Sequence, residues 1–332
     1  MNNLALLKRL SLLVFFMLAA SSAFCDYTTA AVKRDLDRGH YENIMAEYEA
    51  DLAELKQDGS SQKLFEFYEQ FVAYEDQKGL TEWTHAQPSN PVPWTATGLR
   101  FLFQGEGARG QGFAERMNKD QTDLYVGKIT QATVYFKKAI SLNPEDPYAC
   151  DGMIQAARHI PMPETEVIGY YQQALQIMPN MGSIIWDMGL YYSPMWSGTA
   201  EKMMKFIQKN AVSQPKGSSA RLLIIRYYED LSFSKYGTGT YFYGRSEWEY
   251  MKKEFEGFLE VHPSDRRVRT WYSYAAFCGK HYAEANQAFN WLGEQRMGDG
   301  YWTDVEYVKA KTAAKYRYEQ DAPNNIEPPT LR

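Results

Sequence analysis

The chain has 332 residues, of which 45% are hydrophobic and 23% are charged, and its formal net charge is −5. This acidic balance argues against nucleic acid as the main partner, because phosphate binding needs a basic face. Aromatic residues make up 15% of the chain. Burial of so many rings offsets chain entropy, which excludes a disordered polypeptide. The mean hydropathy of −0.52 excludes an integral membrane protein.

Residues 1–25 have the pattern of a secretory signal peptide. The basic pair Lys8 and Arg9 precedes an apolar run that is too short to span a bilayer as a helix, and small residues follow it. We expect cleavage after Ala23 or after Cys25, and the sequence leaves this choice open.

The mature chain is therefore expected in the periplasm, without a membrane span once the signal peptide is removed. A lipid anchor on Cys25 is the alternative, but Phe24 stands where a lipobox needs a small residue. An oxidising compartment would allow Cys150 and Cys278 to pair. Because each lies in an apolar helical pattern, the sequence favours two buried thiols.

After the signal peptide, helix pairs repeat with a period near that of tetratricopeptide repeats. Ala132, Phe136, Ala139 and Pro144 have the spacing of the second helix of such a repeat. Pro179 ends a similar segment 35 positions after Pro144, against about 34 expected. We predict an all-α fold, an α-α solenoid of tetratricopeptide-like helix pairs over residues 26–319. The expected helices cover residues 28–38, 41–57, 60–78, 92–104, 119–142, 146–159, 164–178, 183–192, 199–211, 218–232, 246–261, 265–278, 282–296 and 302–319.

The first helix of one pair carries Trp94, Gly98, Phe101 and Gly105 at the repeat spacing, with Gly105 as the turn glycine. Small residues at these positions let two helices approach, and large rings fill the space between neighbours. Repeat positions also assign Phe136 and further rings to packing; these are Tyr171 and Phe289.

Three stretches interrupt the pattern and are expected to be irregular. They are the connections at residues 105–118 and 233–246 and a Pro-rich tail, residues 320–332, which is predicted to be disordered. Long connections between regular elements are where function often lies.

The motifs of common metal sites are absent from the sequence, and the one cofactor motif lacks the secondary structure that it requires. Gly105–Gly110 matches the letters of a dinucleotide fingerprint, but no strand precedes it, so a flexible loop is the better interpretation. No His stands four residues from another, and no paired Cys spacing occurs. We predict no cofactor, no metal and no catalysis. The alternative is an enzyme whose site forms at the 105–118 loop from Glu106, Arg109 and Glu115.

Some rings fall outside the repeat positions and are expected to line a surface. Trp196, Tyr241 and Tyr243 are the clearest cases, and Tyr and Trp are residues that anchor protein contacts. With Arg109 on one of the interrupting loops, they are the predicted partner-binding residues.

Several segments resemble an uncharacterised bacterial family of tetratricopeptide-like proteins, the domain of unknown function numbered 4034. The resemblance covers about residues 28–297 and is carried by Leu80–Trp83 with Pro88, Ala96–Gly98, Ala108–Gly110, and Met188–Ser197 ahead of Gly198 and Thr199. The family pattern has a basic residue where this chain has Met195. The resemblance implies a tetratricopeptide-like fold and no catalytic residues.

These observations predict an exported helical-repeat scaffold that binds a protein or peptide. An immunity or inhibitor protein for an exported toxin, an enzyme at the 105–118 loop, and a structural protein of the cell envelope remain alternatives.

Overall fold

A computed structural model describes residues 28–58, 62–74, 76–110, 117–143, 146–179, 181–196, 198–236, 245–294 and 304–321. Every regular element in these ranges is helical, which confirms the predicted all-α class. The chain forms two compact units: the N-terminal unit, residues 28–206, and the C-terminal unit, residues 207–321. The predicted signal peptide, most of the predicted tail, and Tyr241 and Tyr243 lie outside the described residues.

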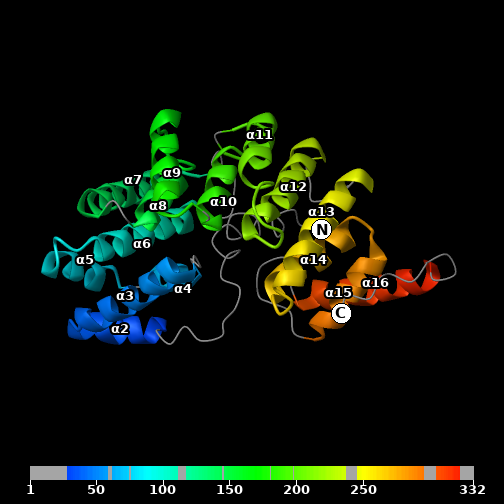
Figure 1. Ribbon diagram of the computed structural model, residues 1–332, viewed down its shortest axis with the longest axis horizontal. Helices are drawn as coiled ribbons and strands as arrows, with labels where there is room; N and C mark the ends of the chain where they lie inside the picture. Colours follow the sequence, from blue (N-terminus) through cyan, green and yellow to red (C-terminus); the bar gives the residue numbers. More distant parts are fainter. Residues whose placement is uncertain are drawn as a thin grey trace. The chain divides into compact units, whose positions relative to one another are not determined.

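In the N-terminal unit, most helices that follow one another in the chain pack against each other (Figure 1). Helix α6 also contacts α8, and α8 also contacts α10, so packing extends to alternate helices. The helices are α2 (Thr29–Arg38), α3 (Tyr41–Asp58), α4 (Gln62–Ala73), α5 (Gln77–Ala86), α6 (Pro91–Arg109), α7 (Lys119–Leu142), α8 (Pro147–Ala156), α9 (Glu164–Ile177) and α10 (Gly182–Tyr191), and α11 (Ala200–Asn210) crosses the boundary between the units.

The C-terminal unit has the same sequential packing, with α12 on α13, α13 on α14, α14 on α15 and α15 on α16. Its elements are the 3-10 turn η2 (Ser219–Leu222), α12 (Leu223–Tyr236), α13 (Arg245–Val261), α14 (Arg266–Cys278), α15 (Tyr282–Leu292) and α16 (Asp304–Asp321). None of the described helices in either unit is both long and apolar enough to cross a membrane.

Close packing of α6, α7 and α8 is centred on the Phe136 ring. A Cβ added at Gly98 on α6 would come within 2.6 Å of this ring, and one at Gly152 on α8 would also overlap it. Phe136 is fully buried. This confirms, for these helices, the prediction that small residues on one helix make room for a large ring of its neighbour. Phe101, Tyr171 and Phe289 are buried as predicted, while Trp94 is half-buried against Tyr135.

Several predicted boundaries are wrong. The connection expected at 233–246 is shorter, because α12 continues to Tyr236 and α13 begins at Arg245, and α16 reaches Asp321 in the expected tail. The sequence pattern begins a loop at Gly105, but α6 continues to Arg109, because Ile129 of α7 packs against the glycine inside the helix. The helix ends at Gly110, whose φ of 66° is a conformation that suits glycine. The helix expected over 60–78 ends early, at Ala73, and α5 is a helix that the sequence did not predict. It begins at Gln77, where Asp76 accepts a hydrogen bond from the Lys78 amide.

Candidate functional site

Two of the four predicted partner-binding residues meet in the N-terminal unit. Arg109 lies in the last turn of α6, and its guanidinium stands 4.8 Å from the centroid of the Trp196 ring. Both side chains are half-buried, and a cation over an indole ring at this distance is a stabilising contact. Two separate motifs thus contribute to one surface feature. Whether Tyr241 and Tyr243 join it is outside the described residues.

A buried arginine also contacts the tryptophan ring of this pair. Arg158 follows α8, its guanidinium lies 5.8 Å from the same Trp196 centroid, and its side chain has no exposed surface. Its Nη1 donates to Asp187 Oδ1 of α10 at 2.7 Å. A buried charge needs such a partner, because removing it from water otherwise costs several kcal/mol.

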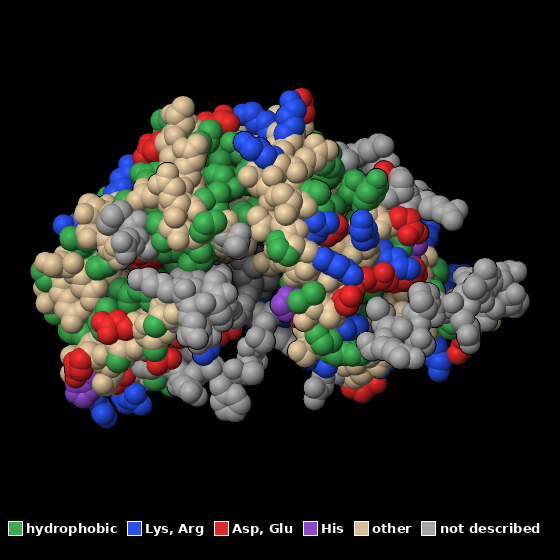
Figure 2. Space-filling view, in the orientation of Figure 1, with side chains coloured by type: hydrophobic (Ala, Val, Ile, Leu, Met, Phe, Trp, Pro, Cys, Tyr) green, Lys and Arg blue, Asp and Glu red, His purple; other side chains and the backbone are tan. Residues whose placement is uncertain are grey.

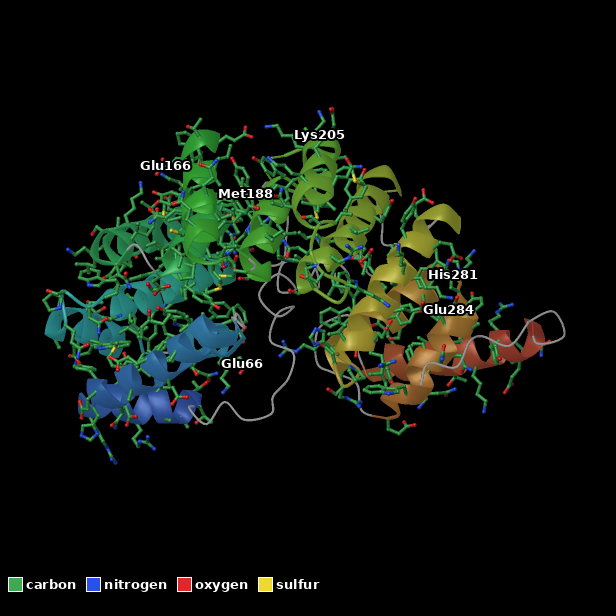
Figure 3. All side chains as sticks on the ribbon, in the orientation of Figure 1. Glu66, Glu166, Met188, Lys205, His281 and Glu284 are labelled. Carbon is green, nitrogen blue, oxygen red and sulfur yellow. The ribbon has the colours of Figure 1, made fainter. Side chains whose placement is uncertain are left out.

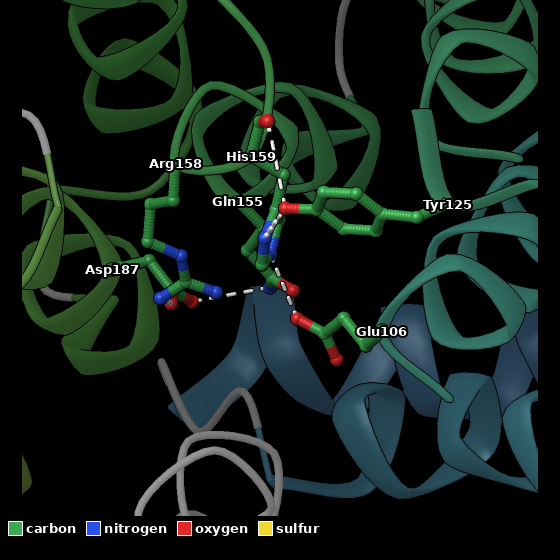
Figure 4. A network of polar contacts seen from close by, with 6 residues as sticks. All are labelled: Glu106, Tyr125, Gln155, Arg158, His159 and Asp187. Carbon is green, nitrogen blue, oxygen red and sulfur yellow. Dashed lines mark hydrogen bonds and ion pairs between the residues drawn. The ribbon is translucent and has the colours of Figure 1, made fainter. Parts of the chain in front are cut away.

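His159 links the pair to α6 and α7 (Figure 4). Its Nε2 lies 2.9 Å from Glu106 Oε1, its Nδ1 lies 2.9 Å from the Tyr125 hydroxyl, and its ring meets Trp196 edge to face. Burial lowers the pKa of His159, so the imidazole is neutral. Because a carboxylate only accepts, Nε2–H donates to Glu106, and Nδ1 accepts from Tyr125.

Two carboxyl groups of the cluster, those of Asp151 and Asp187, accept hydrogen bonds from the same amide. The Gln155 amide donates to Asp151 Oδ2 at 3.2 Å and to Asp187 Oδ2 at 3.1 Å. Burial raises the pKa of Asp151, and the neighbouring Asp187 raises it further. Burial also raises the pKa of Asp187, but Arg158 opposes that shift. Asp151 is therefore the carboxyl group that holds a proton, and Asp187 is the ion-pair partner.

The cluster keeps hydrogen-bonding capacity that its own members leave unused. The donors without an acceptor are Arg158 Nε and Nη2 and Arg109 Nε. The acceptor without a donor is Gln155 Oε1. In a buried cluster such capacity is met by ordered water or by a bound polar group that both donates and accepts.

The order Glu106, His159, Tyr125 has the form of an acid–imidazole–hydroxyl relay. Burial raises the pKa of the Tyr125 hydroxyl to about 12, so this hydroxyl keeps its proton at neutral pH. The hydroxyl also lies 3.5 Å from the carbonyl oxygen of His159, a second acceptor for the same proton. The arrangement therefore fixes the imidazole beside Trp196.

Sequence reasoning missed the buried members of the cluster, Asp151, Gln155, Arg158, His159 and Asp187. A signal was present: Asp151, Gln155 and Arg158 are spaced by four and three positions, which places them on one helical face inside an apolar run. Glu106 and Arg109 were predicted as possible site residues, but they were expected on a loop and lie on α6. Glu115 lies outside the described residues.

Cys150 lies on α8 and is a buried free thiol, and burial raises its pKa to about 12. Such a thiol is protonated and unreactive at neutral pH. Within the described ranges, no group of three or more His, Cys, Asp and Glu side chains is placed to hold a metal ion.

Comparison with known proteins adds no relative. No protein-family model matches the chain, and no curated protein is similar enough to count as a homologue. The function must therefore be argued from the geometry.

Proposed function

We propose that the protein is an exported helical-repeat scaffold that binds a protein or peptide partner at the Arg109–Trp196 pair. The observation that carries the proposal is the placement of this pair over a buried arginine, Arg158, whose Nε and Nη2 have no acceptor. Trp and Arg are the residue types that dominate binding energy at protein interfaces. The buried network holds both side chains in place before a partner arrives, which reduces the entropy cost of binding.

The finer architecture that suits this function is a solenoid of tetratricopeptide-like pairs. Its support is the packing of α6 on α7 and α8 on α9, together with the contacts of α6 with α8 and of α8 with α10. Stacked helix pairs bury a continuous core and present an extended surface for partners. The close approach of Gly98 and Gly152 to Phe136 is the packing that such stacking needs.

Export and periplasmic location are part of the proposal and rest on residues 1–25 alone. A mature N-terminus at Phe24 or Asp26, determined by mass spectrometry of the secreted chain, would support a cleaved signal peptide. A lipid-modified Cys25 would instead support the anchored alternative.

The test is co-purification of the tagged full chain from the periplasm of its native host, with mass spectrometry of what remains bound. We expect a partner that is retained by the wild type and by Lys205→Ala, and lost with Arg109→Gln and Trp196→Ala. Lys205 is an exposed residue of α11 whose removal leaves the cluster intact (Figure 3). Circular dichroism controls for folding.

Failure to retain a partner at both mild and stringent salt would contradict the proposal. Equal retention by the wild type and by both site variants would show that binding occurs without the Arg109–Trp196 pair. A partner encoded beside the gene and toxic to the host would identify the immunity-protein form of the same scaffold.

A further inference from the structure

The C-terminal unit has an open groove of about 770 Å³ between α13 and α15. One stripe of α13 forms its long wall, from Glu249 to Glu260, and Trp291 of α15 also lines the groove. The eleven rises between Glu249 and Glu260 span about 16 Å of helix, which matches an extended segment of about five residues. The volume lies in the range of about 300–1,000 Å³ that is common for ligand sites.

Arg269 of α14 lines the groove and is 7% exposed. Its guanidinium lies 4.1 Å from the centroid of the Trp291 ring. Its Nη2 donates to the carbonyl oxygen of Pro263 at 3.1 Å, but its Nε has no acceptor. No carboxylate of the described residues pairs with it at ion-pair distance. The groove therefore contains a largely desolvated cation without an ion-pair partner, and Asp265 acts on it only from beyond ion-pair distance.

The other charged groups of the wall balance one another. Lys216 pairs with Glu260, and Lys252 pairs with Glu284 at 2.9 Å and with Glu256 at 3.9 Å. Glu284, labelled in Figure 3, lies in the first turn of α15, away from Trp291 near the end of the same helix. Figure 2 shows both signs of charge interspersed over α13 to α15.

Two lining residues remain outside these pairs besides Arg269. Lys253 adds a positive charge, and Glu249, exposed near the start of α13, adds a negative one. The end of the groove at Pro263, Arg269 and Trp291 therefore keeps an excess of positive charge. Trp291 is also 42% exposed, which is a large apolar surface for one side chain.

We infer that this groove binds an extended acidic peptide segment of a partner protein, with a carboxylate side chain at Arg269 and a neighbouring apolar side chain on Trp291. The carboxylate supplies the counter-charge that the folded chain does not, and a charge-assisted hydrogen bond to a desolvated guanidinium is among the stronger polar contacts. The inference rests on the proposed scaffold function, and it adds a second surface and the chemistry of what that surface recognises.

The test uses the purified full chain and three fluorescein-labelled hexapeptides, in which Leu alternates with Glu, with Gln or with Lys. Fluorescence anisotropy at low salt is expected to show saturable binding of the Glu peptide, weaker binding of the Gln peptide and no binding of the Lys peptide. Arg269→Gln and Trp291→Ala should each weaken binding of the Glu peptide by about tenfold or more, and Lys253→Gln by about twofold to threefold.

Matched controls come from the exposed surface of α16. Arg317→Gln removes the same charge and Tyr316→Ala removes an exposed ring, and both should bind the Glu peptide as the wild type does. Trp291→Ala serves as the second variant in case Arg269→Gln fails to fold, and circular dichroism identifies that case.

The inference is overturned if the Glu peptide does not bind, if the Lys peptide binds equally well, or if Arg269→Gln and Arg317→Gln behave alike. These failures are distinct from failure of the proposed function. Absence of a native partner at the Arg109–Trp196 pair would leave peptide binding by the groove unchanged. Retention of that partner without peptide binding would remove the groove alone.

Discussion

Each unit of the protein contains a tryptophan that two arginines contact. In the N-terminal unit, Arg109 and Arg158 lie 4.8 and 5.8 Å from the Trp196 centroid. In the C-terminal unit, Arg269 and Arg266 lie 4.1 and 5.4 Å from the Trp291 centroid. In both clusters the more buried arginine has an Nε without an acceptor.

The two clusters differ in their counter-charge. Arg158 has an ion pair with Asp187, and Glu106 and Asp151 lie in the same network. Arg269 has only the carbonyl oxygen of Pro263 and the face of Trp291. The same residue types therefore form one cluster in which carboxylates of the chain balance the buried arginine charge, and one in which no ion pair does so. What a tryptophan–arginine cluster does depends on the carboxylates around it.

The largest expected effect separates the clusters by stability. Arg158→Gln leaves Asp187 buried without its cation and should lower the free energy of unfolding by about 3–5 kcal/mol. Arg269→Gln loses the contact with Trp291 but also removes the desolvation cost of a cation without an ion pair, so the net change in the free energy of unfolding should be about 1 kcal/mol or less. Urea unfolding followed by circular dichroism measures both.

Lys205→Gln is the reference for a surface pair, because the ion pair of Lys205 with Glu201 is exposed at both ends, and its loss should leave the free energy of unfolding close to that of the wild type. Equal losses for Arg158→Gln and Arg269→Gln would mean that the carboxylates of the first cluster do not distinguish it from the second.

A pH dependence should mark the first cluster through Asp151. Burial and Asp187 raise the pKa of Asp151 in the folded state above its unfolded value of about 4. The folded chain then binds more protons at this site, so its contribution to stability is full below about pH 4 and is lost as the pH rises through the folded pKa. Asp151→Asn should therefore gain stability relative to the wild type as the pH rises.

The measurement is the difference in unfolding free energy between Asp151→Asn and the wild type across pH 4 to 8. Asn keeps an acceptor for Gln155 and a donor for Asp187, as the protonated carboxyl does. A difference that stays constant with pH would place the proton elsewhere. Glu260→Gln, on an exposed pair of the C-terminal unit, is the control for the loss of a surface carboxylate.

Local patterns in the sequence predicted much of the helical framework. The spacing of Gly98 and Phe136 identified a real close packing between α6 and α7, because that contact follows from the size of two residues on consecutive helices. Gly105 is also a small residue at a repeat position, but the sequence pattern assigned it to a turn. The sequence alone does not show that Ile129 fills the space beside it.

The candidate site was predictable only at its rim. Arg109 and Trp196 stood out in local motifs, but Glu106 bonds His159 across 53 positions and Gln155 bonds Asp187 across 32. Such polar contacts depend on which helix faces meet, and hydrophobic spacing does not determine that when helices carry apolar residues on several sides. The nearly all-apolar α10 hides Asp187 for this reason.

The smallest expected effect compares the cation–π contacts directly. Double-mutant cycles pair Arg109→Met with Trp196→Leu, and Arg269→Met with Trp291→Leu. Met keeps an apolar stem in each position, so the coupling energy reports mainly the contact of charge and ring. We expect about 0.5–1 kcal/mol for the half-buried Arg109 and about 1–2 kcal/mol for Arg269, which is closer to its ring and less hydrated. Urea unfolding of the four variants in each cycle gives both values. If the Arg109 coupling is the larger one, contact with the Trp291 ring contributes little to stabilising the charge of Arg269. That charge then depends all the more on a carboxylate from outside the chain.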